Sequence, residues 1–138
     1  MPSVIANAAV EACLREVLAR EGFALNRQRA FGETGVDVVA TRGDEKIFIE
    51  VTGFKSNGPA RSKDFYESFF RAVSRLRDGA GKLAIALPSR AELGLPARAG
   101  QYGEAWHRIG RAFPELEIWL VDVEKRTYRR TAWNDWAR

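Results

Sequence analysis

Apolar residues recur along this chain at two spacings, one typical of helices and one typical of strands. Between Val10 and Leu18 they fall every three or four positions, which predicts a helix from Ser3 to about Arg20. Alternating or continuous apolar runs predict strands over 23–29, 36–42, 46–52, 82–87 and 117–123. The same patterns predict helices from Ser62 or Asp64 to Asp78 and over 103–113. We expect loops over 52–61 and 89–102, where turn-forming residues gather.

The predicted elements follow the order α-β-β-β-α-β, with a C-terminal α-β extension. Three successive strands before a helical crossover favour a mixed central sheet flanked by helices, which is an α/β fold. The 138 residues, 46% of them hydrophobic, suffice for one core but not for two. We therefore expect a single domain over residues 1–138.

Two features of the chain predict its compartment. No apolar run approaches the roughly 20 residues that cross a bilayer, and the first residues lack the basic segment of a secretory signal. The single cysteine, Cys13, falls on the apolar face of the first predicted helix, where a core position is favoured over a nucleophile. We therefore expect a cytoplasmic protein without a membrane partner.

The charge balance is compatible with a nucleic-acid partner. The formal net charge is +4, and arginines far outnumber lysines. The guanidinium group matches the geometry of phosphate bidentately, which favours contacts with a nucleic-acid backbone. A GC-rich genome also enriches arginine, so charge alone leaves both explanations open.

Two carboxylates stand inside apolar strand patterns. Asp37 is surrounded by valines over 36–39, and Glu50 lies in the run 47–51. Burying an acid in such a strand is costly unless it is paired or binds a metal. If the two strands pair through the turn at Gly43-Asp44, Asp37 lies near Glu50 at the end away from the turn. The alternative is that each acid sits at a strand end and pairs with an arginine.

These two acids would offer hard oxygen ligands of the kind that Mg²⁺ or Mn²⁺ prefers, and the main-chain carbonyl of Val51 would add another. Glu11 is a third candidate ligand, because it lies at the rim of the apolar stripe of the first helix. A solvent-facing position is the alternative for Glu11. Water bound to such an ion becomes a better nucleophile toward a phosphodiester.

Three segments carry a family resemblance: Glu11-x10-Gly22-Phe-Ala-Leu-x-Arg27, then Gly35-Val-Asp37, then Ile49-Glu50-Val-Thr52. Over about residues 8–88 they resemble the core of the PD-(D/E)XK, or restriction-endonuclease-like, nuclease superfamily. Their spacing is most similar to its archaeal Holliday-junction-resolvase branch. The resemblance implies a restriction-endonuclease-like core with metal ligation by Glu11, Asp37, Glu50 and the carbonyl of Val51.

The chain departs from this family at one position. The family has a lysine two residues after the glutamate, where it orients and activates the attacking water, and this chain has Thr52 there. Lys46 on the same strand is too far along it, at roughly 13 Å from Glu50. A replacement cation would come from Lys55 in the following loop, or from the flank of the second helix that carries Ser68, Arg71 and Arg75. The resemblance places Arg75 near the position of a glutamine that many members have beside the lysine.

The leading hypothesis is a Mg²⁺- or Mn²⁺-dependent endonuclease or exonuclease that hydrolyses phosphodiester bonds in DNA. Its candidate catalytic residues are Asp37, Glu50, Thr52 and Lys55, and its candidate phosphate-binding residues are Arg61, Arg71 and Arg75. The main alternative is an inactive module of nuclease fold that binds nucleic acid or a protein partner. A structural subunit with an aromatic C-terminal tail is a third hypothesis. Resolvase-like activity would also require a homodimer.

Overall fold

The computed structural model describes residues 4–28, 30 and 35–137. Its α-helices are α1 (Asn7–Arg20), α2 (Gly58–Ser74), α3 (Leu95–Tyr102) and α4 (Glu104–Ala112). Its strands are β1 (Ala24–Leu25), β2 (Val38–Arg42), β3 (Glu45–Val51), β4 (Lys82–Pro88), β5 (Leu116–Asp122) and β6 (Thr127–Ala132). Short 3₁₀ helices are η1 (Arg75–Asp78), η2 (Ser89–Gly94) and η3 (Trp133–Trp136).

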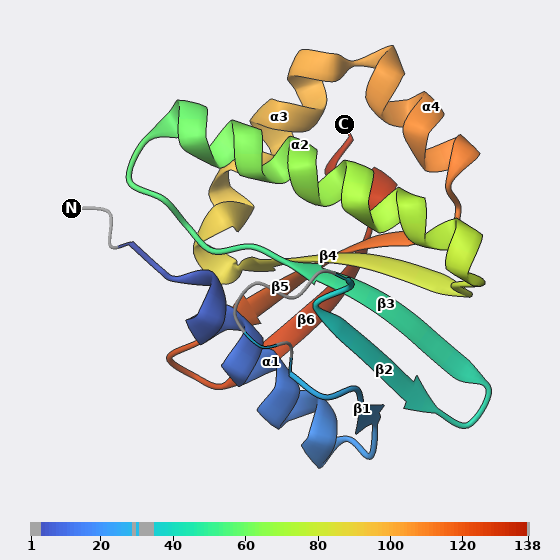
Figure 1. Cartoon of the computed structure of the whole chain (residues 1–138). Coiled ribbons are helices and arrows are strands. Elements are labelled where there is room, and N and C mark those ends of the chain that lie inside the picture. The colour runs from blue at the N-terminus through green and yellow to red at the C-terminus, as the bar shows by residue number, and fades with distance from the viewer. Residues whose placement is uncertain (1–3, 29, 31–34, 138) are drawn as a thin grey trace.

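In the described residues the strands form one mixed sheet, and their order in space is their order along the chain. Strands β1, β2 and β3 pair antiparallel, β3, β4 and β5 pair parallel, and β6 returns antiparallel to β5. Parallel neighbours need a crossover, and α2 supplies the first while η2, α3 and α4 supply the second. Figure 1 shows α1 on one side of the sheet and α2, α3 and α4 on the other. The chain is therefore an α/β protein with a mixed sheet, as its apolar pattern predicts.

Each face of the sheet has its own core. Against α1, the buried side chains include Leu14 and Leu18 from the helix and Val38, Ile49 and Trp119 from the strands. This helix has its apolar residues at the predicted helical spacing, and its buried stripe is complete from Val10 to Leu18. The strand residues that alternate with this set point to the opposite face, toward α2.

The core on the α2 side is rich in aromatic rings. Trp106 of α4 and Trp133 of η3 stack with their ring centroids 3.9 Å apart. Each indole N–H donates to the main-chain carbonyl of the other residue, at 3.0 and 2.9 Å. Phe65 of α2 stacks against both tryptophans. The C-terminal tail is thus part of the core. The two hydrogen bonds satisfy the indole N–H groups, which would be costly to bury without partners.

Two predicted boundaries and one predicted loop are wrong. Strand β1 ends early because the side chain of Asn26 accepts the N–H of Val39 at 2.8 Å in place of a ladder partner. Helix α2 begins at Gly58, because Asn57 caps it by accepting the N–H of Ala60 and Pro59 fits its first turn. The segment 89–102 is η2 and α3 instead of a loop. Ser3, the predicted start of the first helix, lies outside the described residues.

Strand β6 is absent from the predicted elements. It is an edge strand, and none of its six residues is buried, so it lacks the apolar run of the inner strands. Arg130 on this strand lies over the ring of Trp119 and pairs with Glu117 at 3.1 Å and with Glu45 at 3.2 Å. Arg129 pairs with Glu92 at 2.7 Å. These ion pairs join the C-terminal strand to three other elements.

None of the helices formed by the described residues combines the length and the apolar character that a bilayer crossing requires.

The segment that follows β3 is tied to the start of the chain. Ile5 and Phe54 exchange main-chain hydrogen bonds at 3.0 and 2.8 Å, and the N–H of Gly53 donates to the side chain of Asn7 at 2.6 Å. The main chain passes so close that a Cβ added at Gly53 would overlap the carbonyl oxygen of Ile5. This contact fixes the direction in which the chain leaves β3.

We expect Gly53→Ala to lower the free energy of unfolding by about 1–3 kcal/mol, because the added methyl group must push two main-chain segments apart. Urea denaturation monitored by circular dichroism measures the change. Gly94→Ala is the matched control, because a Cβ there meets open space. Equal stability of the two variants would contradict the close approach.

Candidate functional site

The pairing of β2 with β3 brings Asp37 to Glu50. The two strands are joined by the turn at Gly43-Asp44, and Gly43 has a φ of 60° that glycine adopts without steric cost. Val38 pairs with Ile49, and both are fully buried on the α1 face. Continuing this register by one residue sets Asp37 opposite Glu50 and turns both toward the α2 face.

The carboxylate of Glu50 is buried, with only 3% of the residue exposed. Burial raises the pKa of Glu50 to about 7, and the negative charge of Asp37 adds to the rise. The nearby guanidinium of Arg75 acts in the opposite direction and lowers the pKa without cancelling the other two effects. The ionised form of Glu50 is therefore unfavourable in this environment.

Asp37 is held in place from two sides. One of its carboxylate oxygens accepts the N–H of Val51 at 2.8 Å, which ties the side chain to the end of β3. Its main-chain carbonyl accepts the guanidinium of Arg15 at 2.9 Å. Arg15 lies on α1 and also donates to the carbonyl of Asn26 at 2.7 Å. The position of Asp37 is therefore set by β3 and by the helix on the opposite face.

Glu11 does not join the two acids. It pairs with Arg15 one helical turn away, at 2.8 Å, and both side chains are largely buried. Within 4–28, 30 and 35–137, no group of three or more acidic, histidine or cysteine side chains is arranged to hold a metal ion. The structure thus brings together Asp37 and Glu50, and it leaves Glu11 in an ion pair that sequence spacing alone would allow at positions i and i+4.

Thr52 and Lys55 follow Glu50 in the chain, in the segment that comes directly after β3. Thr52 is buried, and its N–H donates to the carbonyl of Ala86 on β4 at 3.0 Å. The side chain of Lys55 pairs with Asp64 of α2 at 3.2 Å. Lys55 is therefore directed to the first part of α2, and the expected return of this cation toward Glu50 is not what the structure shows.

The second helix delivers one cation to Glu50. Arg75, at the junction of α2 and η1, places its Nε atom 3.4 Å from a carboxylate oxygen of Glu50, and only 14% of its side chain is exposed. This is longer than the roughly 2.7–2.9 Å of a strong ion pair. Arg75 also lies 3.7 Å from Asp78. Its contact with Glu50 makes it part of the acid site, and its burial makes it a poor surface contact for phosphate.

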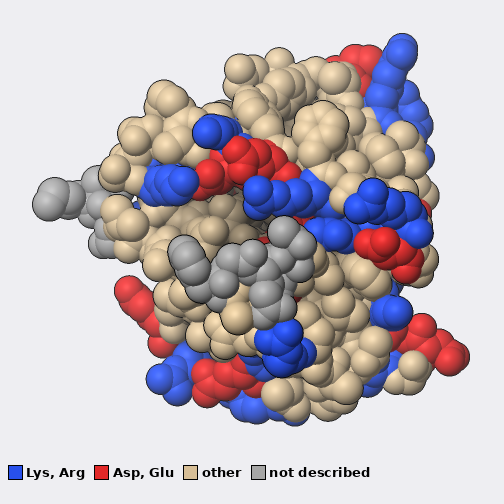
Figure 2. All heavy atoms as spheres, in the orientation of Figure 1, with Lys and Arg blue, Asp and Glu red and all other residues tan. Residues whose placement is uncertain are grey.

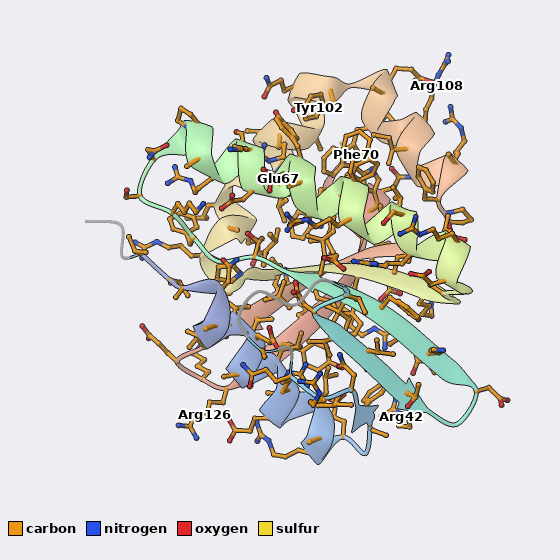
Figure 3. All side chains as sticks on the ribbon, in the orientation of Figure 1. Arg42, Glu67, Phe70, Tyr102, Arg108 and Arg126 are labelled. Atoms are coloured by element: carbon orange, nitrogen blue, oxygen red, sulfur yellow. The ribbon has the colours of Figure 1, made fainter. Side chains whose placement is uncertain are left out.

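Arg71 stays on the surface of α2. It pairs with Glu67 at 3.5 Å and 63% of its side chain is exposed. Figure 3 shows Glu67 and Phe70 on this helix, and Figure 2 shows basic side chains at its level with acidic ones among them. The flank of α2 is thus of mixed charge, although the charge of Arg71 also lowers the pKa of Glu50.

Arg61 lines a pocket of about 340 Å³ that Thr52 also lines and that neither Asp37 nor Glu50 reaches. Arg90 of η2 and Arg98 of α3 also line it. Both lie in the segment expected to be a loop, so they were not candidates. The signal for α3 was present in the sequence, since Leu95 and Ala99 are four positions apart and buried, with Pro96 in the first turn.

No family model matches the chain, and neither a curated protein nor a solved structure matches it.

The donor set suits a hard divalent cation. Two carboxylates approach each other in a buried setting, and burial together with the charge of Asp37 raises the pKa of Glu50. A cation between them would lower the cost of holding both ionised. Such an ion would be held by Asp37 and Glu50 and would supply Lewis-acid activation of water or phosphate. The chain's own part is to fix Asp37 through Val51 and to hold Arg75 near Glu50.

The raised pKa of Glu50 predicts a pH-dependent stability in the presence of a chelator. The folded protein binds a proton at Glu50 more tightly than the unfolded chain, whose ordinary value is 4.5. The associated stability is therefore fully present below pH 4.5 and is lost as the pH rises through about 7. We expect a loss on the order of 3 kcal/mol across this window, measured by urea denaturation at a series of pH values.

Glu50→Gln should flatten this profile, because the amide does not ionise. Glu124→Gln removes an exposed acid and should keep the wild-type slope. A Glu50→Gln profile parallel to the wild type would show that Glu50 does not titrate in this range.

Proposed function

We propose that this protein is a Mg²⁺- or Mn²⁺-dependent phosphodiesterase of restriction-endonuclease-like fold that cuts DNA. The observation that carries the proposal is the approach of Asp37 to Glu50 at the open end of the β2–β3 hairpin, next to Arg75 at the start of η1. Two carboxylates on adjacent strands match the acidic pair of the PD-(D/E)XK pattern, which the sequence resembles. The order α1, β1, β2, β3, α2, β4 matches the core of that superfamily.

The absence of the usual lysine is the main obstacle to this function, and Arg75 is the cation that replaces it in part. A guanidinium near Glu50 supplies positive charge beside a scissile phosphate, but it is a poor base because it stays protonated. Arg75 would therefore stabilise charge, while a metal-bound water would supply the nucleophile.

A second candidate function is a nuclease-fold module that binds nucleic acid or a protein without cutting. The specific observation in its favour is the combination of a buried Thr52 with an ion pair between Glu50 and Arg75. An arginine that neutralises the acid in place of a metal would leave the fold intact and the chemistry lost.

The proposal is tested by incubating the protein with plasmid, single-stranded and branched DNA in Mn²⁺, with and without chelator. Cutting should require the metal and should fall by more than about 100-fold in Asp37→Asn and Glu50→Gln, because each removes a proposed ligand. Asp44→Asn is the matched control, since this exposed acid lies in the turn of the same hairpin.

Calorimetric titration with Mn²⁺ separates the two candidate functions. Binding that Asp37→Asn and Glu50→Gln abolish, together with DNA cutting, supports the phosphodiesterase. Metal binding without cutting favours the inactive module. If Mn²⁺ binds equally to the wild type and both variants, there is no metal site at these acids.

Thr52→Lys provides a gain-of-function test. Thr52 follows Glu50 by two residues and lines the pocket of about 340 Å³, so a longer side chain has space at this position. We expect metal-dependent cutting to rise by about tenfold or more, because a correctly placed cation stabilises developing charge. Thr52→Met has a long side chain without charge and should give no increase. Equal rates for the two variants would show that a cation at position 52 does not assist the reaction.

A further inference from the structure

The pocket that Thr52 and Arg61 line lies at the carboxyl ends of the parallel strands. Thr52 follows β3, Leu87 is at the end of β4, and the first turn of α2 with η2 and α3 forms the remaining wall. Figure 1 shows the start of α2 and η2 on the same side of the molecule, next to these strand ends. In open α/β sheets this edge is where ligands bind. The pocket is thus a place for a ligand, beside the acid site but separate from it.

Three arginines line this pocket, and none of the described residues that line it is acidic. Among the described residues, none of Arg61, Arg90 and Arg98 forms an ion pair. A neighbouring hollow of about 330 Å³ is different, because Glu92, Asp122 and Glu124 line it. The arginine pocket therefore has a local positive charge that no ion pair among the described residues neutralises.

Aromatic rings hold all three arginines in position, and hydrogen bonds add to this for Arg61 and Arg98. Arg61 lies 4.6 Å from the centre of the Phe54 ring and donates to the carbonyl of Lys55 at 2.8 Å. Arg90 lies over the same ring at 5.5 Å. Arg98 lies 4.8 Å from the ring of Phe65 and donates to the hydroxyl of Ser62 at 3.3 Å. Most guanidinium N–H groups are left to donate to a ligand, since each arginine carries five.

We infer that this pocket binds the terminal phosphate monoester of a nucleotide or of a nucleic-acid strand end. A guanidinium group pairs bidentately with phosphate oxygens, and a dianionic monoester neutralises two of the three charges. A backbone phosphodiester carries a single charge and would leave two arginines uncompensated. The size of the pocket, about 340 Å³, is within the range of about 300–1,000 Å³ that small-ligand sites occupy.

The walls of the pocket fit the rest of such a ligand. Phe54, Leu93 and Leu95 give it an apolar side, on which a sugar or a base can pack. Thr52 connects it to the acids, because two residues along a strand span about 6.6 Å. The terminal phosphate would then lie about one nucleotide from Glu50. Binding itself requires neither acid, so the inference does not rest on the proposed catalysis.

The test compares two single-stranded DNA hexamers of one sequence, one with a 5′-phosphate and one with a 5′-hydroxyl, by calorimetry in chelator. Deoxyadenosine 5′-monophosphate and deoxyadenosine form a second matched pair. We expect each phosphorylated ligand to bind at least about tenfold tighter than its twin, because charge-assisted hydrogen bonds are the strong ones. A hexamer that binds tighter than the mononucleotide identifies a strand end as the source, and equal affinities identify a free nucleotide.

Arg90→Gln and Arg98→Gln should each reduce the affinity for the phosphorylated ligand to that for its hydroxyl twin. Arg77→Gln removes the same charge from an exposed position on η1 and should leave the preference unchanged. Asp37→Asn should also keep it, which distinguishes this pocket from the metal site. Thermal melting confirms that each variant is folded. Equal binding of phosphorylated and hydroxyl twins by the wild type, or an equal loss in Arg77→Gln, would overturn the inference.

Discussion

The antiparallel pairing of β2 with β3 is the constraint on which the candidate site depends. Successive side chains of the two strands point to opposite faces of the sheet. Val38 and Ile49 therefore pack on the α1 side, and Asp37 and Glu50 point to the α2 side. A slip of one residue would move every apolar side chain of the hairpin to the wrong face. The apolar packing against α1 thus fixes where the two acids meet.

Burying this acidic pair is unfavourable, and neighbouring groups offset part of the cost. Arg15 of α1 donates a hydrogen bond to the main-chain carbonyl of Asp37, and the N–H of Val51 donates to its carboxylate. Arg75 approaches Glu50 from α2 at a distance too long for a strong pair. Residual cost of this kind is common at functional sites, where local stability is lower than packing alone would allow.

The α/β class, the β2–β3 hairpin and the meeting of the two acids follow from the sequence, because strand alternation and the Gly43-Asp44 turn are local signals. The separation of Glu11 from the two acids does not follow as directly, since helical spacing gives the helix face but not its distance from the opposite side of the sheet. Helix α3 is obscured by Pro96, which ends helices at most positions but is tolerated in a first turn. The arginine pocket depends on α3, so the sequence patterns indicate Arg61 but neither Arg90 nor Arg98.

The charged residues of β6 affect how copies of this protein meet. An edge strand exposes unpaired main-chain groups on which another chain can add a strand. Here that edge carries Arg129 and Arg130, whose guanidinium groups are engaged by acids from other elements. A second copy approaching along β6 would have to break those pairs and desolvate the charges. Sheet extension at this end is therefore disfavoured.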